Sequence, residues 1–407
     1  MVQGRTFGKL QRLCATIVGL VFLLAGIFKI FDPVGAGLVL EEYFRLVHLD
    51  FLLPVAKPLA VAVALFESLL GAALISGIRR VAVAFVTTVL LGFFTLLTLA
   101  LAIFNPNIDC GCFGEVVHLT HLQSLLKNVV LMALSLFAFY PYRNLGTNKV
   151  RKDISFSIAA VLLAGFLVYS WLNIPMVDFT AFAPGSELLV SQDDVEGDEE
   201  YSSVFVYEKN GQQGVFTLDN LPDSTWTFIR TETVHFNRTD VSDAKIALPF
   251  HDSLGVSMDH LAADGNVLVV SVYDPARVRG EVWVNIADAI QGAQDAGFRP
   301  LLLVNSSREA MEGLPSIIPD AREKISGCTY YADRKLLLTL NRANGGATWF
   351  SDGQLIRKFN VRSLPDGEYF LSRSGDDPAE EMLDYSTKGR LQFEGFILNV
   401  SAILLLL

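Results

Sequence analysis

Two cysteines separated by one glycine are the residues of this chain best placed for chemistry. Cys110 and Cys112 lie in the stretch DCGCFGE, and the 407 residues contain only four cysteines. A disulfide between them would close a very small ring, and the strain would make it easy to reduce and exchange. Gly111 relieves part of that strain, and Gly114 lets the chain turn again, because glycine tolerates unusual backbone angles. The spacing predicts a redox-active pair, with a static loop disulfide as the alternative.

Two histidines after the cysteines raise the alternative of a metal site. His118 and His121 could join the two thiolates in the tetrahedral ligand set that zinc prefers. A Cys-x-Cys spacing is, however, tighter than the usual spacing of zinc-binding cysteines. We therefore expect no metal, and we count Asp109, which directly precedes Cys110, among the residues that support a redox site.

The two remaining cysteines are expected to be structural. Cys14 lies near the far end of the first apolar stretch. At a helical rise of about 1.5 Å per residue it is about 25 Å from the outer surface of the membrane, on whose side the Cys-Gly-Cys stretch is expected. It therefore cannot join the pair. Cys328 begins a strand-like run and is expected to be a buried small hydrophobic residue.

Ionisable residues inside apolar segments are functional candidates by default. Glu67 lies near the middle of the second segment, and Lys127 and Asn128 lie in the outer half of the fourth. Helical rise places Glu67 about 3 Å below the membrane centre and Lys127 about 6 Å above it. We predict an ion pair between Glu67 and Lys127, which either fixes helix register or serves a proton relay or quinone site. Lys29 is expected to extend its ammonium to the membrane surface.

Long apolar stretches must position these residues. The chain is 51% hydrophobic with a mean hydropathy of +0.40, which indicates a membrane protein. A span needs about 20 apolar residues. The first stretch lacks a signal-peptide cleavage site and is expected to remain as a span. Five stretches qualify: Leu13–Phe31, Leu52–Ile75, Val81–Phe104, Leu122–Tyr140 and Ile154–Ile174.

Basic residues alternate between the loops and predict the orientation. Lys and Arg are concentrated before the first span, at Arg79–Arg80, and between residues 143 and 152, so these parts are expected to be cytoplasmic. The loop with the two cysteines and residues 178–390 then lie on the opposite side. We predict a bacterial cytoplasmic (inner) membrane protein with a cytoplasmic amino terminus, whose thiols face the oxidising periplasm.

Charge divides the chain near residue 177. Residues 1–177 carry 13 Lys/Arg and 8 Asp/Glu, whereas residues 178–407 carry 19 and 35. The acidic second half argues against a nucleic-acid partner, because phosphate binding needs Lys and Arg. We therefore expect membrane lipid and a periplasmic client or redox protein as the partners.

The second half is expected to contain two soluble regions. Residues 178–245 are β-rich, with strands at Ser203–Tyr207 and Gly214–Leu218 around an Asn210–Gly211 turn, and with a solvated acidic run at 193–200. Residues 246–365 show strand, helix, strand, helix and terminal hairpin, which is the order of a thioredoxin-like α/β domain.

This α/β domain lacks the thiols of a redox enzyme. After the first strand it has Asp274-Pro275-Ala276-Arg277 in place of a Cys-x-x-Cys motif. We therefore predict a non-catalytic recognition domain. Residues 366–390 are expected to form a linker, and residues 391–407 a hydrophobic segment that either makes a sixth membrane segment or lies at the interface.

Several motifs of the first half resemble a known membrane family. They are GLVFLLAGIFKIFDPVG, EEYF, FESLLG, DCGCFGE and LKNVVL, at residues 19–35, 41–44, 66–71, 109–115 and 126–131. Together they resemble the four-helix DoxX-like superfamily, and within it the MauE-type branch of methylamine-utilisation accessory proteins. The whole chain resembles DoxX-family membrane proteins of Bacteroidetes-type bacteria. The resemblance implies a four-helix domain over residues 1–145, followed by a fifth helix at 146–177, and it implies a role in maturing disulfide-rich periplasmic partners.

The expected function is thiol–disulfide exchange with a periplasmic client by Cys110 and Cys112. This chemistry requires no cofactor. The alternatives are a non-enzymatic membrane scaffold or binding protein, and a redox subunit that uses a quinone.

Overall fold

The apolar stretches form the long helices of a bundle. The computed structural model describes residues 2–106, 108–114, 116–140, 150–189, 201–209, 212–216, 227–235, 245–373 and 377–406. Within this part of the chain, five segments are long and apolar enough to span a membrane, and all five agree with the predicted spans to within a few residues. They lie in α1 (Val2–Phe31), α3 (Ala56–Ser76), α4 (Arg80–Phe104), α5 (His121–Phe139) and α6 (Val150–Leu172).

Glycines let α1 and α3 pack closely. A Cβ atom at Gly71 of α3 would lie 2.4 Å from the backbone nitrogen of Leu23, and one at Gly26 of α1 would lie 2.2 Å from Ser68 Oγ. Small residues at such crossings allow two backbones to approach, which favours helix association in lipid. This contact brings the side chains of α1 and α3 together beneath the loop with the two thiols.

Helix α2 (Pro33–Leu46) was not predicted. Asp32 caps it by accepting a hydrogen bond from Gly35 N at 2.9 Å, and Pro33 occupies its first turn. An Asp-Pro pair is a typical start of a helix, because the carboxylate accepts from a free N–H and proline needs none. Helix α2 lies at the same end of the bundle as residues 105–120, which we call the CGC loop. We call this end the loop end.

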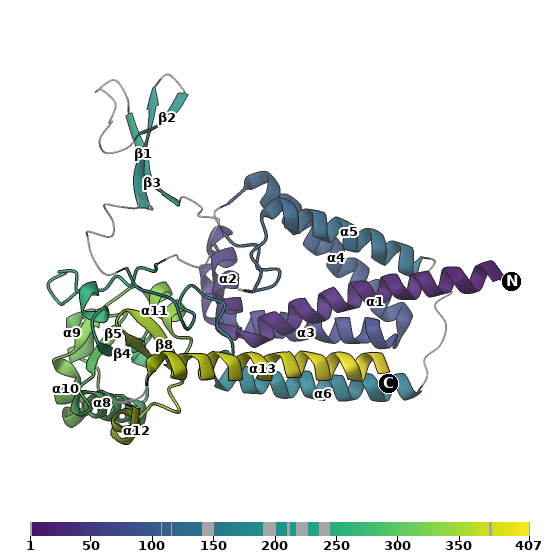
Figure 1. Ribbon diagram of the computed structural model, residues 1–407. Helices are drawn as coiled ribbons and strands as arrows, with labels where there is room; N and C mark the ends of the chain where they lie inside the picture. The colour runs from purple at the N-terminus through teal and green to yellow at the C-terminus, as the bar shows by residue number, and fades with distance from the viewer. Residues whose placement is uncertain are drawn as a thin grey trace.

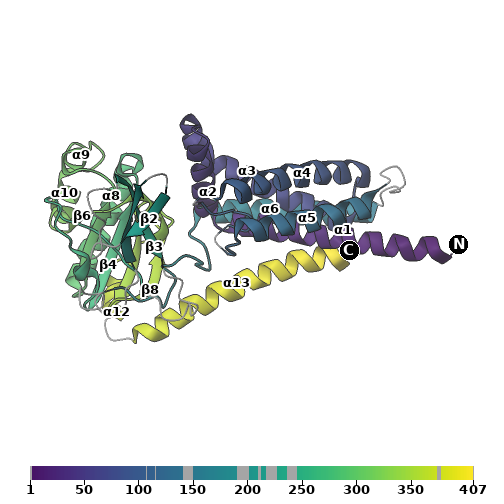
Figure 2. The same ribbon diagram turned by 90° about the horizontal axis from the view of Figure 1, so that it is seen from above.

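The α/β domain is built on a five-stranded sheet at the loop end (Figure 1, Figure 2). The strand order is β6-β5-β4-β7-β8, in which β4, β5 and β6 are parallel and β7 and β8 are antiparallel to their neighbours. The strands are β4 (Asn266–Val272), β5 (Arg299–Val304), β6 (Thr329–Tyr331), β7 (Gly346–Ser351) and β8 (Gln354–Phe359).

Helices cover both faces of this sheet. Side chains from α8 (Gly280–Asp295), α9 (Arg308–Glu312), α10 (Pro319–Ser326) and α12 (Gly367–Arg373) pack on one face, and α11 (Arg334–Leu340) packs on the other. Strand β4 is buried on both sides, as expected for a central strand of a covered parallel sheet. The predicted α/β region is therefore present, whereas its thioredoxin-like class stays a prediction.

A second, three-stranded sheet has the order β2-β1-β3. It consists of β1 (Tyr201–Lys209), β2 (Gln212–Phe216) and β3 (Thr227–His235), all antiparallel. The expected β-rich character of this region is thus present. The expected Asn210–Gly211 turn and the acidic run at 193–200 lie outside the described residues.

The linker expected at residues 366–390 is wrong. These residues include α12 and the first turns of α13 (Pro378–Leu406). Polar residues are common here because one side of α13 is fastened to the α/β domain, where Glu381 forms ion pairs with Arg357 and Arg373. The polar composition therefore reflects a partly solvated helix.

The rest of α13 runs antiparallel to α6 (Figure 1). Phe396 stacks on Phe166 with ring centroids 4.0 Å apart, and Ser155 Oγ donates to Ile403 O at 3.0 Å. The hydrophobic segment at 391–407 thus packs along a candidate membrane span over its described residues. Membrane embedding of this segment remains a proposal, and α13 is not among the five candidate spans.

Candidate functional site

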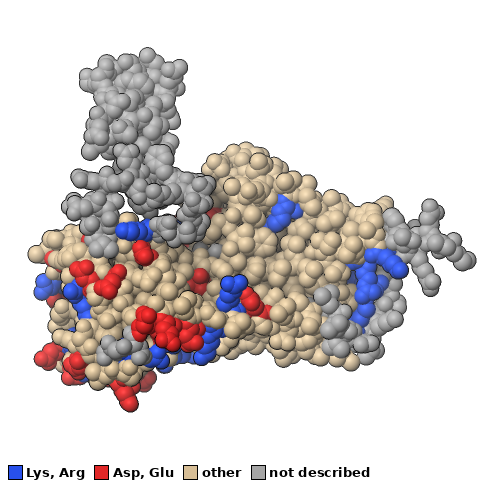
Figure 3. All heavy atoms as spheres, viewed as in Figure 1, with Lys and Arg blue, Asp and Glu red and all other residues tan. Residues whose placement is uncertain are grey.

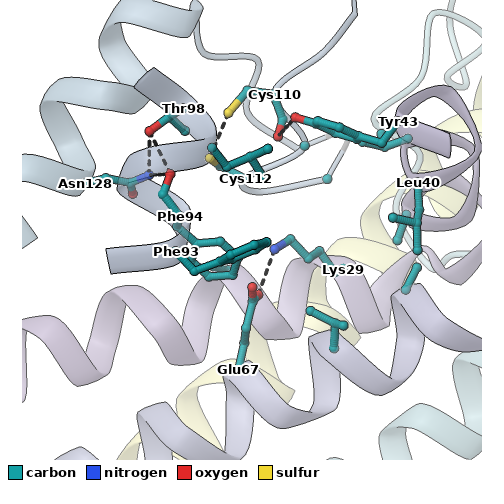
Figure 4. A pocket seen from close by; sticks show the side chains of 18 of the residues that line it. Lys29, Leu40, Tyr43, Glu67, Phe93, Phe94, Thr98, Cys110, Cys112 and Asn128 are labelled. Atoms are coloured by element: carbon teal, nitrogen blue, oxygen red, sulfur yellow. Dashed lines mark hydrogen bonds and ion pairs between the residues drawn. The ribbon is translucent and has the colours of Figure 1, made fainter. Parts of the chain in front are cut away.

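The two thiols of the CGC loop lie in contact. Cys110 Sγ and Cys112 Sγ are 3.0 Å apart and both side chains are partly buried (Figure 4). Gly111 between them has φ = +64°, and a Cβ atom there would lie 2.4 Å from Val39 Cγ1. Only glycine avoids both the backbone strain and the clash. The loop is therefore shaped so that the two sulfur atoms can form or break a bond with little movement.

The surroundings make the two thiols unequal. The hydrogen bond from Cys110 lowers the pKa of Cys112, and the positive charges of Lys127 and Lys29 lower it further, although burial opposes them. The same hydrogen bond and burial raise the pKa of Cys110. Cys112 is thus the thiolate of the reduced pair and Cys110 carries the proton. A thiolate is both the better nucleophile and the better leaving group.

Lys127 is held close to the thiols by an aromatic ring. Its Nζ lies 4.8 Å from the centroid of Phe113, a residue of the CGC loop. A cation over a ring face is attracted by the ring quadrupole. The contact directs Lys127 toward the loop, which explains its effect on Cys112.

The predicted ion pair between Glu67 and Lys127 is wrong. Glu67 Oε2 lies 2.7 Å from Lys29 Nζ, and the two side chains are 2% and 15% exposed. Because α1 and α3 pack so closely, Lys29 points into the bundle beside Glu67. It does not extend to the membrane surface as predicted. Position along a helix predicts the depth of a residue but not the direction in which its side chain points.

Asn128 joins α5 to α4 through hydrogen bonds. It is 3% exposed and its amide donates to Phe94 O and to Thr98 Oγ1, both at 3.2 Å. These bonds tie α5 to α4 and close one wall of the site. In lipid, hydrogen bonds between helices are a common means of association.

The alternative metal site is not assembled. His118 Nδ1 lies 3.6 Å from Asp109 Oδ1, with both side chains exposed, and His121 Nε2 lies 3.0 Å from Pro106 O. Within the described ranges, no group of three His, Cys, Asp or Glu side chains could hold a metal ion. Both imidazoles therefore contact residues of the CGC loop, and His121 does so from the first residue of α5.

A largely apolar cavity of about 470 Å³ adjoins the thiols. Figure 4 shows Cys110 and Cys112 on one side of it and the Lys29–Glu67 pair on another. Its other polar residues are Tyr43, Thr98, Lys127 and Asn128, and most of its wall is aliphatic or aromatic. Side chains of α1, α2, α3, α4, α5 and the CGC loop all contribute. No local sequence pattern predicts this cavity.

Helix α2 connects the CGC loop to the α/β domain. Tyr43 Oη donates to Cys110 O at 3.1 Å, and burial raises the pKa of Tyr43, so the phenol keeps its proton. The preceding residues pair with the start of α11: Glu41 with Arg334 at 2.9 Å, and Glu42 with Lys335 at 2.7 Å. The sequence singled out these three α2 residues only as part of the EEYF motif.

A buried ion pair completes this interface. Arg342 Nη2 lies 2.7 Å from Asp32 Oδ2, and the two side chains are 5% and 10% exposed. Asp32 is also the cap of α2, so one carboxylate both starts the helix and binds the domain. A second pair, between Lys358 and Asp178, lies at the same end of the molecule.

The other cysteines are structural, as predicted. Cys14 is 7% exposed and packs in a cluster with Val18 and Leu74. Cys328 is 8% exposed in the core of the α/β domain, where burial raises its pKa to about 11. Neither thiol has the basic surroundings of Cys112.

The comparisons with known proteins concern the membrane region and the small sheet. Residues 8–141 match the family described as Methylamine utilisation protein MauE, and this range includes the CGC loop and every residue of the cavity. Residues 201–235 match a domain of unknown function, DUF8463. No curated protein and no solved structure matches the chain. The first match covers about a third of the chain and shows that this region is similar to MauE.

Proposed function

We propose that this MauE-type membrane protein oxidises thiols of a client protein through Cys110 and Cys112. The carrying observation is the contact of two unequal thiols, 3.0 Å apart, on a loop whose glycine permits the bond between them. A pair with one low-pKa thiol has a stabilised reduced form, which makes its disulfide a stronger oxidant. The family name connects MauE to methylamine utilisation, and the client of this chain is proposed as a protein that needs disulfides.

The exchange would proceed in two steps. A client thiolate attacks Cys110 Sγ, the Cys110–Cys112 bond breaks, and Cys112 leaves as a thiolate beside Lys127. A second client thiolate then attacks the client sulfur of the mixed disulfide. Cys110 leaves and takes a proton, and the client keeps the new disulfide. Two electrons pass from the client to the pair.

The orientation of the protein is part of this proposal. Figure 3 shows basic side chains at the end of the bundle that is far from the α/β domain, and few charges on the visible face between the ends. Basic residues favour the cytoplasmic side. We therefore place the amino terminus in the cytoplasm of a bacterium and the CGC loop, with residues 178–390, in the periplasm.

The α/β domain is proposed as a thioredoxin-like domain that positions the client without exchanging thiols. Its order of strands and helices supports this class. The segment after β4, where a thioredoxin-like enzyme would carry its cysteines, is Asp274–Arg277. Asp274 exchanges two hydrogen bonds with Asn344, at 3.0 and 2.8 Å. This edge lies beside Arg342, which binds Asp32 of the bundle.

Trapping of mixed disulfides tests the proposed function. The Cys112→Ser variant should accumulate adducts between Cys110 and client proteins that dithiothreitol releases. The Cys110→Ser variant should accumulate far fewer, and Cys328→Ser should behave as the wild type. If no variant forms reducible adducts and the wild-type pair does not exchange with added dithiols, the proposal fails and a scaffold function is favoured.

A further inference from the structure

We propose that the cavity beneath the CGC loop binds the head group of a lipid-soluble quinone, which reoxidises Cys110 and Cys112. The inference rests on the proposed function, because a pair that oxidises a client is left as a dithiol and needs an acceptor for two electrons. Three properties of the cavity indicate the kind of acceptor: where it opens, its size, and the polarity of its lining.

The cavity opens toward the position of lipid. Leu59 and Val63 of α3 and Phe93 of α4 line it and are 42%, 39% and 59% exposed, and all three belong to candidate membrane spans. Exposed apolar side chains inside a span face hydrocarbon. A ligand dissolved in the bilayer can therefore reach the cavity between these side chains, which favours a lipid-soluble acceptor.

Size and lining suit a ring with an apolar tail. The volume of about 470 Å³ falls within the roughly 300–1,000 Å³ of ordinary small-molecule sites. Aliphatic and aromatic residues make up most of the wall, and the polar groups gather near Cys112 and Lys29. In such a site the small polar head of a ligand lies beside the thiols, and its apolar tail extends toward the opening.

The charges near the thiols match the charge that quinone reduction creates. Lys127 and Lys29 both act on Cys112, and both line the cavity. A fixed ammonium stabilises negative charge that develops on a quinone oxygen. Glu67 holds Lys29 in place through its 2.7 Å ion pair. We assign Lys29 as a binding residue of this site and Glu67 as the residue that positions it.

The redox step balances with a quinone as oxidant. Formation of the Cys110–Cys112 bond removes two electrons from the pair and releases one proton, from Cys110. The quinone takes up two electrons and two protons and becomes a quinol. The second proton comes from bulk water. The disulfide is then ready for another client.

The first experiment measures turnover with decylubiquinone or menadione as the probe. Full-length protein in detergent is reduced with dithiothreitol, freed of the reductant and mixed with the quinone without oxygen. We expect one quinol per wild-type protein. Val63→Trp, at the rim, should lower the rate at least tenfold. Val89→Trp is the matched control, because Val89 is 56% exposed on α4 and does not line the cavity.

The second experiment measures binding without thiols. A variant carrying Cys110→Ser and Cys112→Ser should still bind decylubiquinone, and adding Val63→Trp should abolish that binding. Binding by this variant without client trapping by the single variants would overturn the proposed function and the electron transfer, but not the site. Client trapping with no quinol formed would overturn the inference alone. Native mass spectrometry that finds only phospholipid, not displaced by quinone, would also overturn it.

Discussion

The loop end of the bundle and the core of the α/β domain give the same amino acid opposite chemistry. Cys112 and Cys328 are both shielded from solvent, yet the pKa of Cys112 is lowered and that of Cys328 is raised to about 11. Only Cys112 has a second thiol and two ammonium groups close by. Burial alone therefore makes a thiol inert, and neighbouring charge makes it reactive. The thiol whose pKa is lowered therefore lies in the loop of the membrane region, and the thiol whose pKa is raised lies in the α/β domain.

Removal of single thiols is the strongest test of this contrast. Cys112→Ala should reduce the rate of disulfide exchange by about a thousandfold or more, because without Cys112 no disulfide forms in the pair and no thiolate can leave. Cys328→Ala should leave the rate unchanged within about twofold. The rate is measured with a fluorescent dithiol peptide. If both variants lost the same fraction of the exchange rate, the contrast between Cys112 and Cys328 would be contradicted.

Loss of the buried ion pair between Arg342 and Asp32 should weaken the contact between the α/β domain and the bundle. Arg342→Met leaves Asp32 buried without this partner, and breaking such a pair costs about 3–5 kcal/mol. Lys335→Met, whose side chain is 70% exposed, should cost about 1 kcal/mol or less. The measurement is the resistance of the α/β domain to thermal unfolding and limited proteolysis in the full chain. Similar small effects for both variants would contradict the assigned interface.

Removal of one ammonium group should make Cys112 more like an ordinary thiol. Thiolate is present above the pKa, so a lowered pKa keeps Cys112 reactive at lower pH than a free cysteine. Lys127→Met should shift the pH profile of alkylation upward and slow the reaction near pH 6 by about tenfold. Lys127→Arg should retain most of the effect. An unchanged profile in Lys127→Met would show that the partner thiol alone tunes Cys112.

The smallest expected effect concerns the bond between α2 and the CGC loop. Tyr43→Phe removes the hydrogen bond to Cys110 O and should cost about 1 kcal/mol. Hydrogen–deuterium exchange should rise in the loop and stay constant in the core of the α/β domain. A rise in both would mean that the phenol supports the fold as a whole.

The sequence could predict what depends on local pattern. Apolar runs gave the five spans, and alternating strand and helix signals gave most of the α/β domain. The Asp32–Pro33 pair is also a local signal for the start of α2. The partner of Glu67 could not be predicted, because position along a helix gives depth but not the direction in which a side chain points.

The interface and the cavity depend on contacts between distant residues. Arg342 and Asp32 are 310 positions apart, and no local pattern connects them. The cavity likewise arises from several helices and a loop. The polar composition of the first turns of α13 predicts a linker. Composition alone does not distinguish a solvated loop from a helix that Glu381 binds to a domain through ion pairs.

Three consecutive residues of α2 connect the α/β domain to the CGC loop. Glu41 and Glu42 hold the α/β domain, and Tyr43 holds the carbonyl of Cys110. A displacement of the α/β domain would therefore be transmitted within one helical turn to the backbone of Cys110. The position of the domain and the distance between the two sulfur atoms are thus expected to be coupled.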